Sequence, residues 1–181
     1  MTRTIIGLMG AGDEASPVDL QRASELGRLI ANRGWALLTG GRRSGVMHAA
    51  SQTAKEFGGL VIGILPGSDT NDMSEFVDIA IVTDMGSARN NINVLSSRVV
   101  IACGMGPGTA SEIALALKAR RSVVLLCEQE SGKAFFQAMR PELVTLVETA
   151  EEAVEAVLVC LENQIAGDWL RPQSSLAGEN T

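Results

Sequence analysis

Short, wholly apolar segments alternate with longer segments of helical periodicity, and this pattern constrains the fold more than any other feature. The apolar segments are 4–9, 35–39, 60–65, 78–82, 98–103, 122–126 and 143–147. The helical segments are 17–33, 45–57, 87–96, 109–119, 132–139 and 149–163. Strands that are apolar throughout are covered on both faces, as in a parallel sheet. The alternation therefore predicts an α/β fold: a Rossmann-like, doubly wound, mostly parallel sheet of about six or seven strands.

The length and the composition favour a single domain. The chain has 181 residues, of which 46% are hydrophobic, which is enough for one well-packed core and short for two. We assign residues 1–166 to one Rossmann-like ligand-binding domain. After Gly167 the composition changes to Pro, Gln, Ser, Gly and Asn. We therefore expect residues 167–181 to form a disordered C-terminal tail.

The charge and the cysteine content bear on partners and on compartment. A formal net charge of −6 argues against a general nucleic-acid or anionic-membrane surface. No apolar run reaches the roughly 20 residues that a membrane span needs, and the start of the chain lacks the regions of a secretory signal. Three widely spaced cysteines without a CxxC pair are typical of reduced thiols. We expect a cytoplasmic protein with no nucleic-acid and no membrane partner.

Three glycine-rich turns follow predicted strands, at 7–13, 39–47 and 104–109. In open α/β sheets, ligands bind beyond the carboxyl ends of the strands, near the point where the strand order reverses. Glycines at the start of a helix leave backbone N–H groups free to hold an anion such as phosphate. The alternative is that each turn serves only local packing. The candidate binding residues are Gly10, Gly12, Gly40, Gly41, Arg42, Arg43, Gly45, Gly106, Pro107, Gly108 and Thr109.

Two common nucleotide motifs are missing from these turns. The first turn does not match G-x-G-x-x-G, and no acidic residue follows the second strand where a ribose-binding one belongs. We therefore expect no NAD site. No G-K-[ST] occurs either, so a Walker-type phosphate loop is not predicted.

Two stretches carry a family resemblance. "LLTGGRRSGVM" (37–47) and "GMGPGTASEIALAL" (104–117) resemble the superfamily of Lonely Guy (LOG) cytokinin-activating phosphoribohydrolases, once misnamed lysine decarboxylases. "ARNNINVLSS" (88–97) and "GMGPGTASE" (104–112) are most similar to the molybdenum cofactor carrier branch of that superfamily. The resemblance covers residues 4–160 and implies a Rossmann-like fold with a site for a phosphate-bearing heterocycle.

The resemblance also implies roles for residues outside the glycine turns. The LOG pattern P-G-G-x-G-T-x-x-E is preceded by an arginine followed by lysine. Its arginine and glutamate correspond to Arg89 and Glu112, which would be the catalytic residues of a hydrolase. Here Asn90 replaces the lysine, and Gly104-Met105 replaces the leading Pro-Gly. We add Arg89, Asn90 and Glu112 to the cofactor-binding residues, and we assign no catalytic residue to a carrier and no metal ligand.

Structural explanations compete with these roles. Thr109-x-x-Glu112 matches a capping box, in which the glutamate returns to a backbone amide and needs no ligand. Adjacent Arg42 and Arg43 are compatible with a solvated turn, although an anion or a second subunit would relieve their repulsion. Cys103 closes a strand beside the third turn, where a buried free thiol is the common outcome.

Two functions remain open. The first is a molybdenum cofactor (molybdopterin) carrier or storage protein, which needs binding and protection without chemistry, with segment 66–76 closing the pocket. The alternative is a LOG-like phosphoribohydrolase that splits a nucleoside 5′-monophosphate into free base and ribose 5-phosphate. The resemblance implies a homo-oligomer, a dimer or tetramer. Besides the phosphate-bearing small molecule, the partners of a carrier would be molybdoenzymes or their insertion proteins.

Overall fold

The computed structural model describes residues 3–169. Its strands and helices follow the predicted order, with most boundaries within two residues of the predicted ones. The strands are β1 (Ile5–Gly10), β2 (Ala36–Thr39), β3 (Leu60–Leu65), β4 (Ile79–Val82), β5 (Val99–Cys103), β6 (Ser122–Leu126) and β7 (Val144–Val147). The helices are α1 (Pro17–Asn32), α2 (Gly45–Glu56), the 3-10 turn η1 (Gly86–Arg89), α3 (Asn90–Ser96), α4 (Pro107–Lys118), α5 (Glu130–Met139) and α6 (Ala150–Trp169).

The strands form one sheet in the order β4-β3-β2-β1-β5-β6-β7. Every pair of neighbours is parallel. The predicted α/β, doubly wound fold is thereby confirmed. The strand order runs one way from β1 to β4 and the other way from β5 to β7, so the reversal lies between β1 and β5. A ligand site is expected beyond the carboxyl ends of these two strands.

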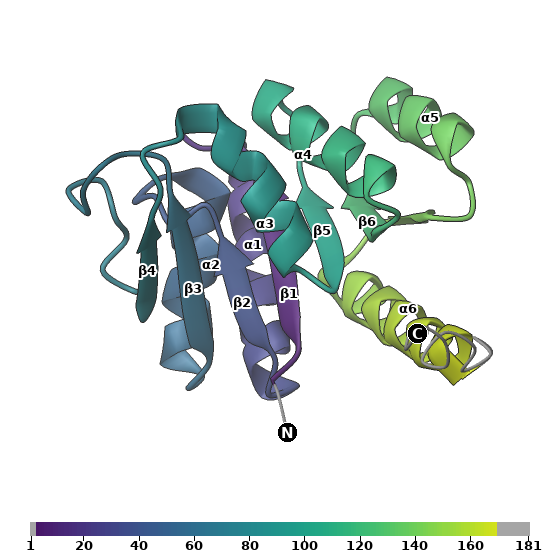
Figure 1. Cartoon of the computed structure of the whole chain (residues 1–181), viewed down its shortest axis with the longest axis horizontal. Helices are drawn as coiled ribbons and strands as arrows, with labels where there is room; N and C mark the ends of the chain where they lie inside the picture. The colour runs from purple at the N-terminus through teal and green to yellow at the C-terminus, as the bar shows by residue number, and fades with distance from the viewer. Residues whose placement is uncertain (1–2, 170–181) are drawn as a thin grey trace, which may run out of the picture.

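Helices cover the sheet on both faces, as the apolar strands predict. One core layer joins the sheet to α1, α2 and α6, through residues such as Leu26, Ala50 and Val154. The other joins it to α3, α4 and α5, through Val94, Ile113 and Phe136. Figure 1 shows α3 and α4 in front of the sheet and α1 and α2 behind it. The apolar periodicity of each helix therefore marks the face that packs on the sheet.

Helix boundaries differ from prediction at two places that matter later. Helix α4 begins at Pro107, with Gly106 as its N-cap, and not at residue 109. A proline in the first turn is favourable because its missing N–H has no intrahelical partner there. Helix α6 continues to Trp169, beyond the predicted end at 163 and past the predicted domain boundary at 166. The rest of the predicted tail, 170–181, lies outside the described residues.

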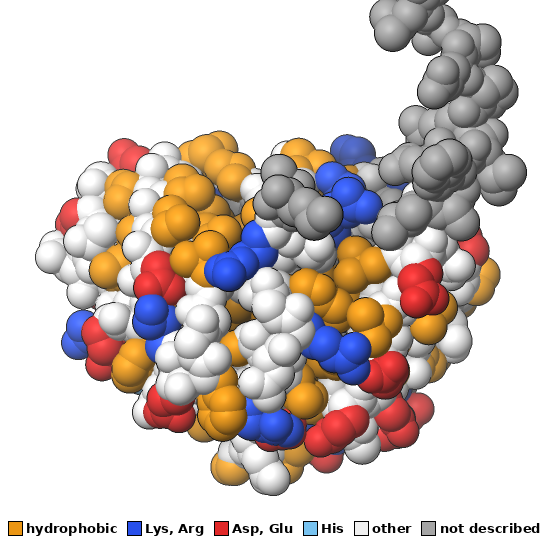
Figure 2. All heavy atoms as spheres, turned by 90° about the horizontal axis from the view of Figure 1, so that it is seen from below, with side chains coloured by type: hydrophobic (Ala, Val, Ile, Leu, Met, Phe, Trp, Pro, Cys, Tyr) orange, Lys and Arg blue, Asp and Glu red, His pale blue; other side chains and the backbone are white. Residues whose placement is uncertain are grey.

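The amino ends of the strands lie on the side of the molecule opposite to their carboxyl ends, where the ligand site is expected (Figure 1). Figure 2, seen from below Figure 1, shows Lys and Arg side chains scattered among hydrophobic ones on this side. Lys55 and Lys118 lie in the last turns of α2 and α4, where a cation favours the helix dipole. Arg98, just before β5, exchanges hydrogen bonds with Gln164 of α6. These hydrogen bonds give Arg98 a structural role.

Within residues 3–169, no helix combines the length and the apolar character needed to cross a membrane.

Candidate functional site

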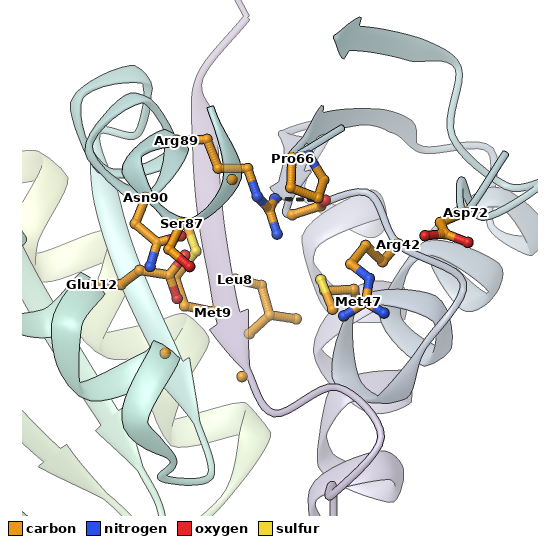
Figure 3. A pocket seen from close by; sticks show the side chains of 14 residues that line it. Leu8, Met9, Arg42, Met47, Pro66, Asp72, Ser87, Arg89, Asn90 and Glu112 are labelled. Carbon is orange, nitrogen blue, oxygen red and sulfur yellow. Dashed lines mark hydrogen bonds between the residues drawn. The ribbon is translucent and has the colours of Figure 1, made fainter. Parts of the chain in front are cut away.

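A cavity of about 360 Å³ opens at the carboxyl end of β1, beside the strand-order reversal. Figure 3 shows two walls with Leu8 and Met9 of β1 between them. Ser87, Asn90 and Glu112 belong to one wall, and Arg42, Met47 and Asp72 to the other, with Arg89 reaching in between. The cavity is lined by Leu8, Met9, Gly10, Gly40, Arg42, Met47, Pro66, Asp72, Gly86, Ser87, Arg89, Asn90, Gly108 and Glu112.

Arg89 is the most deeply placed cation of the cavity, with only 9% of the residue exposed. Its Nη1 donates to the Gly40 carbonyl at 2.7 Å and to the Ile64 carbonyl, so β2 and β3 both hold it. A Cβ on Gly40 would lie 2.5 Å from this Nη1, so a side chain at position 40 would displace the guanidinium from this place. The Arg89 Nε has no hydrogen-bond partner although it is buried. A buried unpaired donor is costly, and a ligand acceptor would satisfy it.

The paired arginines of the second glycine turn have separate surroundings. Arg42 lines the cavity, whereas the Arg43 Nε forms an ion pair with Glu75 at 3.2 Å. Both border a smaller neighbouring hollow of about 220 Å³. An anion is therefore not needed to relieve Arg43, because Glu75 does so. The positive charge that faces the main cavity comes from Arg42 and Arg89, while Asp72 and Glu112 are the acidic residues of the lining.

Burial lowers the pKa of the Arg89 guanidinium, the Glu112 carboxylate opposes this shift, and the Arg42 charge adds to it. Two guanidinium groups that repel each other across a cavity favour an anion between them, because an arginine keeps its charge at any physiological pH. This side of the cavity is therefore a donor-rich, cationic site.

Glu112 does not form the capping box that its spacing from Thr109 suggests. Because α4 begins two residues earlier than predicted, the cap position belongs to Gly106, and no side-chain cap bond forms. Instead the Glu112 Oε1 accepts a hydrogen bond from the Asn93 Nδ2 at 2.8 Å. Burial raises the pKa of this carboxyl to about 7, although the Asn93 hydrogen bond and the Arg89 charge act the other way. The carboxyl is thus free for a ligand and lines the cavity.

The start of α4 leaves its backbone uncovered. A Cβ built on Gly106 or Gly108 would meet nothing within 4 Å. Gly108 lines the cavity, whereas Gly106, Pro107 and Thr109 lie outside the lining. The free N–H groups of a helix start attract anions, so the helix dipole adds to the two arginines.

The remaining glycine positions have packing roles. A Cβ on Gly45 would lie 2.0 Å from the Gly12 carbonyl oxygen, and one on Gly41 would lie 2.9 Å from the Gly63 Cα. These contacts bring the first two glycine turns and β3 into close approach. Gly12, Gly41 and Gly45, which we predicted as binding residues, are not among the residues that line the cavity.

Several lining residues were not predicted from the sequence. Met9 and Met47 are apolar, and nothing in the sequence indicated a role for them in binding. Ser87 directly precedes the stretch 88–97, which carries part of the family resemblance. Pro66 and Asp72 belong to the segment 66–76 that was expected to close the pocket, and both contribute to the lining. The isolated bridge between Arg42 and Met73 holds this segment against the second glycine turn.

Two other reactive side chains lie outside the cavity lining. Cys103 is a buried free thiol whose Sγ contacts the Asp19 carbonyl of α1 at 3.5 Å, and burial raises its pKa to about 12. His48, the sole histidine, pairs through Nδ1 with the Ser74 Oγ at 3.0 Å and packs on Phe76. Both have local structural partners.

The fold and the cavity define a LOG-like Rossmann protein with a site for an anionic ligand. The chain belongs to the SLOG cluster4 family, whose model matches residues 3–154. The LOG resemblance predicted from the sequence is thereby confirmed. A curated relative from Archaeoglobus fulgidus, described as an uncharacterized protein, is 44% identical over 88% of this chain and 96% of its own length. A cytokinin riboside 5′-monophosphate phosphoribohydrolase from Mycobacterium tuberculosis is 33% identical over 52% of this chain and 51% of its own length.

Solved structures place the chain nearer to one branch. It is similar to the molybdenum cofactor binding protein from Rippkaea orientalis, with 52% identity, a TM-score of 0.88, and coverage of 89% of this chain and 99% of that chain. It is also similar to the Moco carrier protein from Chlamydomonas reinhardtii, with 51% identity, a TM-score of 0.85, and coverage of 90% and 99%. These likenesses confirm the predicted closeness to the molybdenum cofactor carrier branch.

Proposed function

We propose that this protein binds the molybdenum cofactor and holds it as a carrier or storage protein. The observation that carries the proposal is the cavity itself, where Arg42, Arg89 and the open start of α4 converge. The molybdenum cofactor is a pyranopterin with a terminal phosphate and a dithiolene-bound oxo-molybdenum group, so it has two anionic parts. The similarity of this chain to two molybdenum cofactor proteins, over nearly their whole length, supports this ligand.

The residues present fit such a group. The unpaired Arg89 Nε and the open backbone at Gly108 are donors for the phosphate or the oxo-molybdenum group. The same cavity is also lined by Asn90, Gly10 and Gly40, which are among the proposed binding residues. When bound, the cofactor would supply redox chemistry to a recipient enzyme, and this chain would supply only binding and shielding. Pro66 and Asp72, from the segment over the cavity, would limit access of solvent.

A phosphoribohydrolase is the alternative, and one observation favours it: Arg89 and Glu112, the residues that match the LOG catalytic pair, line one cavity. The similarity to the mycobacterial phosphoribohydrolase covers only half of either chain, which is why we place the carrier first.

We further infer that the protein is a homo-oligomer, a dimer or tetramer, that works in the cytoplasm and delivers its ligand to molybdoenzymes or their insertion proteins. Three free cysteines are compatible with a reducing compartment. The apolar side chains of Ile79, Ile81 and Leu95 are 43–48% exposed, and their burial would favour association of two copies.

Mass spectrometry of protein purified without oxygen tests the proposed function. We expect the molybdenum cofactor, or its pterin oxidation products together with molybdenum, to co-purify with the wild-type protein. A parallel assay with a panel of nucleoside 5′-monophosphates should show no release of free base above background. Base release that is lost in Glu112→Gln, without co-purifying pterin, would establish the hydrolase instead.

A further inference from the structure

Hydrogen-bond acceptors gather on the α3–α4 wall of the cavity. The Glu112 carboxyl is 7% exposed and receives one described hydrogen bond, from the Asn93 Nδ2. An ionised carboxylate has about four lone-pair positions, so most of its accepting capacity is unused. The Asn93 side chain that donates this bond is itself buried, and its Oδ1 has no hydrogen-bond partner. Glu112 is therefore an acceptor with unused capacity that lines the cavity.

The charged side chains of the lining are divided between the two walls. Arg89 and Arg42 supply donors and positive charge, with Asp72 beside Arg42 as a counter-charge, whereas Glu112 supplies acceptors and negative charge on the α3–α4 wall. Within residues 3–169 no ion pair joins Arg89 to Glu112, so the two charges do not neutralise each other by direct contact. Figure 3 shows the Arg89 guanidinium pointing into the cavity and Glu112 on the wall beside Asn90. A ligand that satisfies both ends must carry an anionic part and a separate set of N–H or O–H donors.

Burial makes the ionised form of the Glu112 carboxyl unfavourable when no ligand is bound. Desolvation disfavours the ionised form of Glu112 more than its protein partners favour it, so its pKa is raised to about 7. The groups that offset the desolvation are the Asn93 amide and the Arg89 charge. A ligand with two adjacent N–H donors would supply the missing hydrogen bonds to the carboxylate, as a guanidinium does when it pairs with two oxygens.

A pterin has such an edge. Its 2-amino group and its ring N3–H lie side by side and point the same way, and its 4-oxo group is an acceptor. We propose that Glu112 pairs with this aminopyrimidine edge and thereby selects 2-amino-4-oxo pterins over heterocycles that lack the amino group. This inference rests on the proposed cofactor-binding function and adds the part of the ligand that the chain recognises. Glu112 is a ligand contact, and Asn93 is a positioning residue that holds its carboxyl.

Fluorescence titration with two matched probes tests the inference. The probes are 6-hydroxymethylpterin and 6-hydroxymethyllumazine, which differ only in that lumazine has a carbonyl in place of the 2-amino group. We expect the wild-type protein to prefer the pterin by about 10- to 100-fold, the effect of one or two charge-assisted hydrogen bonds. Glu112→Gln should bring the ratio to within about 3-fold of one, because its amide can donate to the lumazine carbonyl.

Three further measurements separate the possible explanations. Glu162→Gln, at an exposed position of α6, removes the same charge far from the cavity and should retain the wild-type preference. Asn93→Ala should lower the preference partly and shift the pH at which pterin affinity rises, since it removes a hydrogen bond that lowers the pKa of Glu112. Thermal unfolding of each variant shows whether the fold is intact.

The outcomes distinguish this inference from the proposed function. Wild-type protein that co-purifies with the molybdenum cofactor but binds the two probes equally, or binds neither, overturns the inference alone. A preference that survives in Glu112→Gln also overturns it. Wild-type protein that carries no pterin compound and releases base from nucleotides overturns the proposed function, and the inference with it.

Discussion

Two glycine-rich walls of the cavity use the same residue type for opposite reasons. After β2, a Cβ on Gly40, Gly41 or Gly45 would lie 2.9 Å or less from a neighbouring atom. At the start of α4, a Cβ on Gly106 or Gly108 would meet nothing within 4 Å. The first wall needs glycine for close packing of the protein on itself, whereas the second leaves backbone free for something else. Glycine content alone does not separate packing from binding.

The largest expected effect is on the tightly packed wall. Gly45→Ala should lower the free energy of unfolding by about 3–5 kcal/mol, because Gly45 has φ +53° and a Cβ would lie 2.0 Å from the Gly12 carbonyl oxygen. Gly34→Ala is the matched control, since Gly34 has φ +69° but open surroundings. It should cost only about 1–2 kcal/mol, the strain of the backbone itself. Equal losses in urea denaturation would show that the close approach contributes nothing.

The next effect concerns Glu112, the buried acidic residue of α4. Burial raises the Glu112 pKa from 4.5 to about 7, so between these pH values the folded protein holds a proton that the unfolded chain has released. Stability therefore falls as the pH rises through this window, by up to about 3 kcal/mol. Glu112→Gln cannot titrate and should lack this decline. Unfolding free energies of both proteins at about pH 5 and about pH 8 measure it, and parallel curves for the two proteins would contradict the shift.

A smaller effect is expected where Arg89 bridges the two walls. Arg89→Ala should weaken binding of the molybdenum cofactor by about 1.5–3 kcal/mol, the value of a hydrogen bond to a charged group. Arg98→Ala removes an arginine at the opposite end of the sheet and should leave the affinity unchanged. Calorimetry with the same cofactor preparation compares them. Similar losses in both variants would mean that the ligand lies elsewhere.

The smallest change in stability should come from the open glycines. Gly108→Ala should raise the unfolding free energy by no more than about 1 kcal/mol, because an alanine there restricts the unfolded chain without a clash. Gly106→Ala should leave it nearly unchanged, because alanine is disfavoured at the N-cap position that Gly106 occupies. Their effects on binding should differ. Gly108 lines the cavity and Gly106 does not, so only Gly108→Ala should lower cofactor affinity. If Gly106→Ala weakens binding as much, the ligand extends beyond the cavity described above.

Local sequence patterns are enough to predict the sheet and the parts of the chain that surround the ligand. Strands such as Val99–Cys103 are apolar on both faces, so their burial between two helix layers follows from local composition. The glycine turns follow strands, and parallel strands end at one edge, which is why residues as distant as Gly10 and Gly108 were expected together. These features depend on neighbours in the sequence or on the general geometry of a parallel sheet.

The partners of individual side chains, in contrast, depend on how distant segments pack together. The spacing of Thr109 and Glu112 matches a capping box, but helix α4 starts at Pro107 and Glu112 turns to Asn93 on another helix. Arg42 and Arg43 are adjacent, yet one lines the cavity and the other pairs with Glu75. A hydrogen bond or an ion pair forms with whatever group lies within about 3–4 Å. Because those groups come from distant segments, their identity follows from packing and not from local sequence.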